Sequence, residues 1–104
     1  DDPVDYPDFA KPVAKALVAG EVEKGVLICG TGIGMSISAN RVTGVRAALC
    51  TNSEMAALSR LHNNANILVL GARVTDLAIA QDCLRAFLET RFEGGRHLPR
   101  VEKI

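Results

Sequence analysis

The fold of this chain is decided by residues 25–34, which have the sequence Gly-Val-Leu-Ile-Cys-Gly-Thr-Gly-Ile-Gly. Residues 25–29 are a short, uninterrupted apolar run that stops at a glycine, which is typical of a strand buried on both faces of a parallel sheet. Residues 30–34 supply three glycines for a tight turn, and residues 35–40 follow as a short helix. The segment therefore predicts a strand–turn–helix unit of an α/β protein.

Further strands and helices are predicted on both sides of this segment. The predicted strands are residues 45–50 and 66–70, and the predicted helices are residues 8–19, 53–62 and 75–90. Alternation of buried strands with amphipathic helices predicts parallel neighbouring strands in a sheet that helices cover on both faces. The expected fold class is α/β, a three-layer sandwich with a flavodoxin-like (Rossmann-type) parallel sheet.

The predicted sheet is thin for this fold class. Only three strands are predicted in the 104 residues, and the first predicted element is a helix. Parallel α/β sheets usually contain more strands than this. We therefore expect a single domain over residues 1–104 that is N-terminally incomplete, with its N-terminal strands missing. Either the chain is a fragment, or a partner completes its core.

Charge and composition exclude several kinds of partner. Lys plus Arg number 12 and Asp plus Glu number 12, so bulk charge predicts no nucleic-acid or membrane-surface partner. The sequence contains no run of about 18 apolar residues, so we expect no transmembrane helix. The three cysteines, Cys29, Cys50 and Cys83, have neither zinc-site spacing nor an even number for disulfides. We therefore expect no metal site and a reducing, cytoplasmic location.

The glycine loop at residues 30–34 is a candidate anion-binding site. In open α/β sheets, ligands bind beyond the carboxyl ends of the strands. The glycines let backbone N–H groups approach a ligand, and the helix N-terminus behind them adds positive potential. The third glycine comes one residue too early for a dinucleotide fingerprint, and no Lys-Ser/Thr pair follows as in a P-loop. The alternative is a tight turn that binds nothing.

Cys29 is a candidate base or nucleophile because it ends the strand directly before this loop. Positive potential at that point favours the thiolate, which is the reactive form of cysteine. The alternative is a small apolar filler, the usual role of a cysteine in a buried strand. We expect the filler role for Cys50, which ends the next predicted strand, and for Cys83, which lies on a helical apolar stripe.

A second polar cluster, His-Asn-Asn-Ala-Asn at residues 62–66, leads into the third predicted strand. His62 could transfer protons near neutral pH, and the asparagines could bind sugar hydroxyls. The alternative is a helix C-cap, which suits Asn63 or Asn64.

A third cluster contains Arg96 and Arg100, four residues apart after a Gly-Gly turn. Together with Arg73 they could hold a phosphate through bidentate hydrogen bonds. From spacing alone, a solvated basic tail is the better interpretation of the two tail arginines.

Together these segments resemble the ribose-5-phosphate isomerase B and galactose-6-phosphate isomerase family. The matching residues are 5–8, 20–21, 27–37, 39–40, 44–47, 59–63, 66–68, 71–74, 92–97 and 100–101. They run through the chain in the family's order, and several motifs in one chain are far more specific than any single motif. The family's first strand, which carries an Asp-His pair, has no counterpart in these residues, consistent with the expected incomplete domain.

The resemblance implies an enzyme that interconverts an aldose phosphate and a ketose phosphate through an enediolate, without a metal or cofactor. It implies that Cys29 removes the proton next to the carbonyl, and that Thr31 and His62 assist ring opening and proton transfer. Loop amides would stabilise the enediolate oxygen. These amides belong to Gly30, Gly32, Ile33 and Gly34. Some members use a Glu after the loop, where this chain has Met35, so the cysteine variant is implied.

The resemblance also implies the substrate contacts and the assembly. Tyr6 and Asn63 would contact the sugar, and Arg73, Arg96 and Arg100 would bind the phosphate. The expected reaction interconverts ribose 5-phosphate and ribulose 5-phosphate; allose 6-phosphate and galactose 6-phosphate are alternative substrates. The expected assembly is a homodimer, or a dimer of dimers, with shared sites. A phosphate-binding module or fragment without catalysis is the alternative function.

Overall fold

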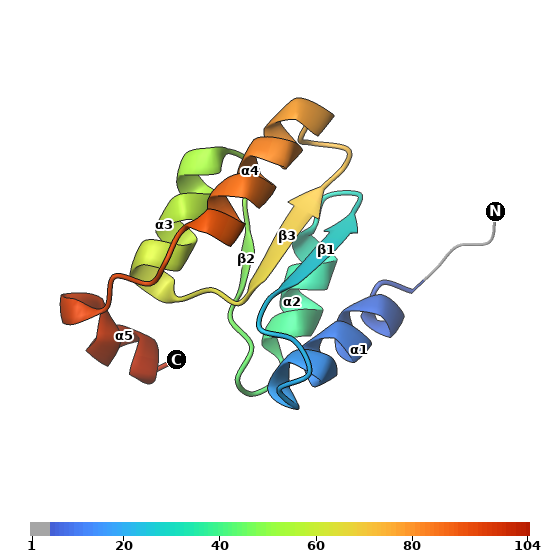
Figure 1. Cartoon of the computed structure of the whole chain (residues 1–104). Helices are drawn as coiled ribbons and strands as arrows, with labels where there is room; N and C mark the ends of the chain where they lie inside the picture. The colour runs from blue at the N-terminus through green and yellow to red at the C-terminus, as the bar shows by residue number, and fades with distance from the viewer. Residues whose placement is uncertain (1–4) are drawn as a thin grey trace.

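The computed structural model describes residues 5–104, so the first four residues of the predicted domain lie outside the described residues. The elements are α1 (Pro7–Val18), β1 (Gly25–Cys29), α2 (Ile33–Asn40), β2 (Ala47–Leu49), α3 (Ser53–Asn63), β3 (Ile67–Gly71), α4 (Leu77–Glu89), the 3₁₀ helix η1 (Gly95–His97) and α5 (Leu98–Glu102) (Figure 1). Every predicted strand and helix is present, with ends that differ by at most two residues.

Side-chain caps determine where two of the helices begin. The Asn52 carboxamide oxygen accepts a hydrogen bond from the Met55 N–H at 2.8 Å at the start of α3. The Asp76 carboxylate does the same for the Ile79 N–H at 3.0 Å at the start of α4. Each cap satisfies a backbone donor that has no partner within the helix. None of the helices within residues 5–104 combines the length and the hydropathy that a membrane crossing requires.

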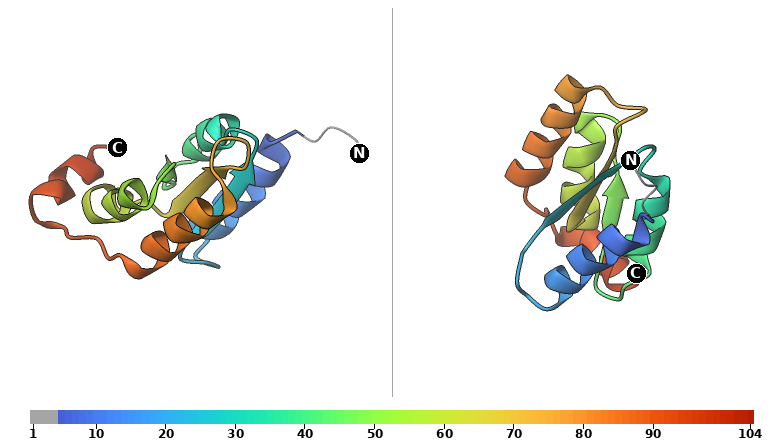
Figure 2. Two further views of the ribbon diagram at one scale, coloured as in Figure 1. Left: turned by 90° about the horizontal axis from the view of Figure 1, so that it is seen from above. Right: turned by 90° about the vertical axis from the view of Figure 1, so that its right-hand side faces the viewer.

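The three strands form one parallel sheet in the order β1-β3-β2. The central strand is β3, and all five of its residues are buried. Ile67 and Val69 pack with α1 and α2 on one face, whereas Leu68 and Leu70 pack with α3 and α4 on the other. Figure 2 shows the three layers that result. The predicted α/β sandwich with a parallel sheet is confirmed.

The prediction that β1 is buried on both faces is wrong for the described residues. Leu27 is buried, but Val26 is 37% exposed and Ile28 is 58% exposed. β1 is an edge strand with β3 as its neighbour, and α4 packs against β3. A continuous apolar run therefore identified the strand correctly but could not show that helices leave one of its faces open.

β2 is shorter than predicted, and asparagine side chains bind the backbone at its start. The Asn40 side chain accepts a hydrogen bond from the Ala47 N–H at 2.7 Å and donates one to the Ala47 carbonyl at 2.9 Å. The Asn66 carboxamide oxygen accepts the Arg46 N–H at 2.7 Å. The Asn40 side chain thus satisfies backbone groups of Ala47 that a further strand would otherwise satisfy.

The tail after α4, which the sequence left unassigned, folds into η1 and α5. The chain turns at Gly94 and Gly95, which have φ values of 73° and 53°. The Glu93 N–H donates to the Leu61 carbonyl at 3.1 Å, and this bond joins the tail to the last turn of α3. In Figure 1 the tail lies beyond the end of α3, away from the loop that follows β1.

Candidate active site

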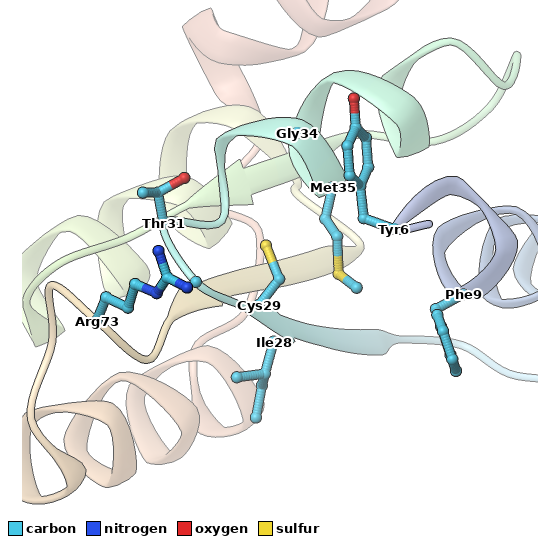
Figure 3. A pocket seen from close by; sticks show the side chains of 9 residues that line it. Tyr6, Phe9, Ile28, Cys29, Thr31, Gly34, Met35 and Arg73 are labelled. Atoms are coloured by element: carbon cyan, nitrogen blue, oxygen red, sulfur yellow. The ribbon is translucent and has the colours of Figure 1, made fainter. Parts of the chain in front are cut away.

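A pocket of about 620 Å³ lies at the carboxyl end of β1 (Figure 3). It is lined by Tyr6, Phe9, Ile28, Cys29, Gly30, Thr31, Gly34, Met35 and Arg73. Six of the residues predicted for the site therefore meet around one space, although they come from three separate parts of the chain. The carboxyl end of a parallel sheet is also where α/β proteins bind ligands.

The Cys29 thiol is half-buried and accepts a hydrogen bond from the loop that follows it. The donor is the Gly32 N–H, at 3.2 Å from the sulfur. Gly32 is the N-cap of α2 and has a φ of 85°, a left-handed conformation that glycine adopts without strain. An amide donor and a helix N-terminus both stabilise negative charge on sulfur. The Cys29 sulfur is therefore held against a backbone amide at the N-terminus of α2.

Tyr6 closes the side of the pocket that faces the start of α2. A Cβ atom at Gly34 would lie 2.8 Å from the Tyr6 ring, so glycine is needed for this close approach. Thr31 lies on the other side of Cys29 in Figure 3. Its hydroxyl accepts the Ile33 N–H at 3.3 Å, which holds the turn of the loop.

Arg73 reaches the pocket because the loop after β3 is hydrogen-bonded to the loop after β1. The Ala72 N–H donates to the Cys29 carbonyl at 2.7 Å, and the Arg73 N–H donates to the Gly30 carbonyl at 2.8 Å. The Arg73 side chain lies over Gly30, where an added Cβ would be 3.3 Å from Nε. The guanidinium therefore shares the pocket with Cys29 (Figure 3).

Gly32 and Ile33 lie in the loop beside Cys29, whereas the other four predicted site residues, His62, Asn63, Arg96 and Arg100, lie at the opposite end of the sheet. The Gly25 N–H donates to the Asn66 carbonyl at 2.9 Å, which places the end of α3 near the start of β1. β1 has five residues and spans about 15 Å. His62 and Asn63, in the last turn of α3, are therefore separated from Cys29 by the length of the strand, and the tail packs beside them. The predicted site residues therefore form two separate groups within one chain. The Cys29 half-site contains residues 6, 29–34 and 73, and the His62 half-site contains residues 62, 63, 96 and 100.

Arg96 and Arg100 belong to the second half-site. They lie in η1 and α5, and both side chains are exposed. The nearby ring of His97 stacks on that of His62, with 4.2 Å between the centroids. The positively charged, exposed tail next to His62 can bind an anion. The tail does not reach the Cys29 pocket of its own chain, which lies at the other end of β1.

The expectations for the other two cysteines are confirmed. Cys50 and Cys83 are buried within the core between the sheet and helices α3 and α4. Burial, together with a smaller effect of the nearby Cys83, raises the pKa of the Cys50 thiol to about 11. Burial also raises the pKa of Cys83. Both thiols are therefore apolar fillers, in contrast to the half-buried Cys29.

The predicted C-cap is also confirmed, at Asn64, which has a φ of 48°. The sequence did not identify Arg60, which is buried and donates to the Asn64 side chain at 3.0 Å and to the Thr90 carbonyl at 3.1 Å. Burial lowers the pKa of Arg60, and Arg46 lowers it further. Arg60 lies four residues after the buried Ala56 and so on the same face of α3, and this spacing was the sequence signal for its burial.

Three comparisons relate this geometry to known proteins. The sequence model of the family described as Ribose/Galactose Isomerase matches residues 1–104. The chain belongs to the ribose/galactose isomerase family. Ribose-5-phosphate isomerase B of Escherichia coli is 50% identical over 100 residues, which are 96% of this chain and 67% of that protein. The predicted family resemblance is therefore confirmed, and with it the enzyme class, a sugar-phosphate isomerase.

Solved structures of this family have the same fold. Ribose-5-phosphate isomerase B of Clostridium thermocellum superposes with a TM-score of 0.96 and 56% identity, over 98% of this chain and 69% of that chain. The Mycoplasma genitalium enzyme, solved with bound ribulose 5-phosphate, superposes with a TM-score of 0.92 and 45% identity, over 99% of this chain and 68% of that chain. Both of these proteins are therefore longer than the part of them that this chain matches.

Proposed function

We propose that this chain interconverts ribose 5-phosphate and ribulose 5-phosphate, with Cys29 as the base. The observation that carries the proposal is the half-buried Cys29 thiol, which accepts the Gly32 N–H in the pocket beyond β1. The choice of sugar is supported by the names of the relatives, one of which was solved with ribulose 5-phosphate.

The proposed chemistry is proton transfer between adjacent carbons. The Cys29 thiolate takes the proton from C2 of the open-chain aldose, and the electrons of that C–H bond form the C1–C2 double bond of an enediolate. The negative charge gathers on O1, close to the amides of the loop at residues 30–34. The same thiol then returns a proton to C1, while O2 loses its proton to become the ketose carbonyl and O1 takes up a proton to become the C1 hydroxyl. The pair of steps is balanced without an oxidant or a metal.

The remaining site residues bind and open the sugar. Ring opening needs a proton on the ring oxygen and removal of one from O1, the roles proposed for Thr31 and His62. Tyr6 and Asn63 contact the sugar hydroxyls. The phosphate is bound by Arg73, Arg96 and Arg100, whose planar guanidinium groups match phosphate oxygens.

We also propose that each site is shared by two copies of the chain, in a homodimer or a dimer of dimers. Support comes from the length of β1, about 15 Å, which separates Cys29 from His62 in one chain. A second copy can supply the His62 half to the Cys29 half. Exposed apolar side chains, Ile28 at 58% and Leu77 at 74%, are also consistent with a partner surface. A reducing cytoplasm fits the three free cysteines.

The function is tested by measuring ribulose 5-phosphate formation from ribose 5-phosphate by the purified protein. Unphosphorylated ribose is the control, and we expect little turnover because the arginines then have no ligand. Allose 6-phosphate and galactose 6-phosphate are assayed in parallel. Faster turnover of either hexose phosphate would overturn the choice of substrate. Binding of a phosphorylated enediolate mimic without any turnover would instead favour a phosphate-binding role.

The shared site is tested by co-expressing Cys29→Ala and His62→Ala chains, each of which should be strongly impaired alone. If each site takes its cysteine from one chain and its histidine from the other, a mixed dimer contains one intact site and one doubly altered site. Random pairing then restores about a quarter of the sites, which is the expected recovery for a twofold-symmetric dimer. No recovery in isolated mixed dimers would show that the sites are not shared.

A further inference from the structure

The His62 half-site contains a second imidazole, His97, whose ring lies against that of His62. The two ring centroids are 4.2 Å apart and the ring planes differ by 20°, so the rings are stacked. His62 is half-buried at the end of α3, and His97 ends η1 in the tail. Segments about 35 residues apart in sequence therefore meet at one aromatic contact.

The backbone holds His97 in this position. The Glu93 N–H donates to the Leu61 carbonyl at 3.1 Å, one residue before His62. The chain then reverses at Gly94, and the His97 N–H donates to the Gly94 carbonyl at 3.0 Å. The tail is thus bonded to the last turn of α3 before it presents His97. The contact belongs to a defined turn and not to a freely moving side chain.

His97 is also the more buried member of the pair. It is 5% exposed, and its Nε2 atom has no hydrogen-bond partner among the described residues. Burial lowers the pKa of His97, and His62, Arg96 and Arg100 lower it further, against an opposing effect of Glu93. The ring is therefore neutral at neutral pH. A neutral ring presents a π face on which an imidazolium can stack without charge repulsion.

A metal site fits the same residues less well. Single ligand atoms of His62, Glu93 and His97 lie within 4.8 Å of one another. Metal ions bind imidazole nitrogen in the plane of the ring, whereas stacked rings present their faces to each other. Two arginines, Arg96 and Arg100, also oppose a cation here. The geometry favours the stacked pair.

We propose that His97 is a positioning residue that holds the His62 imidazole in its orientation for proton transfer to the sugar ring. This proposal rests on the proposed function, because His62 is the group that transfers the proton. The stack fixes the plane of the His62 ring, and the neutral partner leaves His62 free to accept a proton.

The test compares His97→Ala, which removes the ring, with His97→Phe, which keeps a flat ring but removes both nitrogens. We expect His97→Ala to lower kcat/KM for ribose 5-phosphate by about tenfold, a fraction of a full general acid–base contribution. His97→Phe should recover most of the activity. Equal losses in the two variants, with unfolding midpoints unchanged, would overturn the proposal, because the nitrogens of His97 would then be the groups that matter.

A double variant separates positioning from a general structural effect. If His97 acts through His62, then His62→Ala combined with His97→Ala should be no slower than His62→Ala alone. Additive losses would overturn the proposal. Ring-proton NMR shifts of His62 report the stack without any turnover: they should move in His97→Ala and be largely kept in His97→Phe. An unchanged His62 spectrum in His97→Ala overturns the stack itself, whereas an inactive wild type overturns only the proposed function.

Discussion

The two ends of the sheet hold the two halves of the candidate site, and they are built differently. At the carboxyl end, Cys29 and its loop lie within one short stretch of sequence, and Tyr6 and Arg73 are brought to it by packing and by two backbone hydrogen bonds. At the amino end, His62 meets a tail about 35 residues later in the chain. The comparison shows that local sequence encodes the proposed base, whereas tertiary contacts assemble the second half-site.

The difference also concerns dependence on a partner. The Cys29 half has a pocket of its own within one chain. The His62 half has exposed arginines, and Cys29 lies at the other end of β1 from it. Changes at Cys29 should therefore act on the chemical step, and changes at the exposed tail arginines should act mainly on phosphate binding.

The largest effect is expected for Cys29→Ala. Loss of the proposed base should lower kcat by about 10²- to 10⁴-fold, the usual range for general-base catalysis. Binding of a phosphorylated enediolate mimic and the unfolding midpoint should change little. Cys50→Ala and Cys83→Ala are the matched controls and should remain active, because both thiols are buried in the core. If Cys29→Ala keeps more than about a tenth of the turnover, which this range does not permit, the base lies elsewhere.

Gly32→Ala should cause the next largest effect, on stability as well as on rate. Its φ of 85° costs an alanine about 1–2 kcal/mol. An added Cβ would lie 2.5 Å from Leu49 Cδ1, and such overpacking costs about 1–3 kcal/mol more. Gly20→Ala is the control at the opposite end: its φ is 80°, but no atom lies within 4 Å of the added Cβ. Urea unfolding should show a larger loss for Gly32→Ala, and equal losses would contradict the crowded loop.

Arg100→Ala should have a smaller effect, seen in KM more than in kcat. A hydrogen bond to a charged group contributes about 1.5–3 kcal/mol, which corresponds to roughly 10- to 100-fold in kcat/KM. Arg85→Ala, at an exposed position on α4, is the matched control and should behave as wild type. A fall in kcat with KM unchanged would mean that Arg100 acts on the transition state and does not simply hold the phosphate.

The smallest effect concerns stability at alkaline pH. The buried Cys50 thiol has a raised pKa of about 11, compared with 9.0 for an ordinary cysteine. Its stabilising effect is complete below about pH 9 and is lost as the pH rises toward about 11, because the unfolded thiol releases its proton first. Unfolding free energies measured across this range should fall more steeply for wild type than for Cys50→Ala. Parallel curves would show that Cys50 is not protected from ionisation.

Much of the fold was predictable because its signals are local. The three apolar runs that predicted strands are the three strands, and Asn52 and Asp76 cap the helices that follow them. The exposed face of β1 was not predictable, because a continuous apolar run has the same sequence whether or not a helix covers it. The tail was left unassigned, since η1 and α5 are too short for periodicity to reveal.

The sequence by itself determined the strand–loop–helix unit, the placement of Cys29 before the glycines and the filler role of Cys50 and Cys83. These features depend on neighbouring residues and on burial patterns that repeat along the chain. Only the tertiary structure decided that Arg73 joins Cys29, that His97 stacks on His62, and that the two half-sites lie at opposite ends of the sheet. The physical reason is that a helix joining two parallel strands runs in the direction opposite to the strands. Residues at the end of β1 and at the end of α3 therefore lie at opposite ends of the sheet.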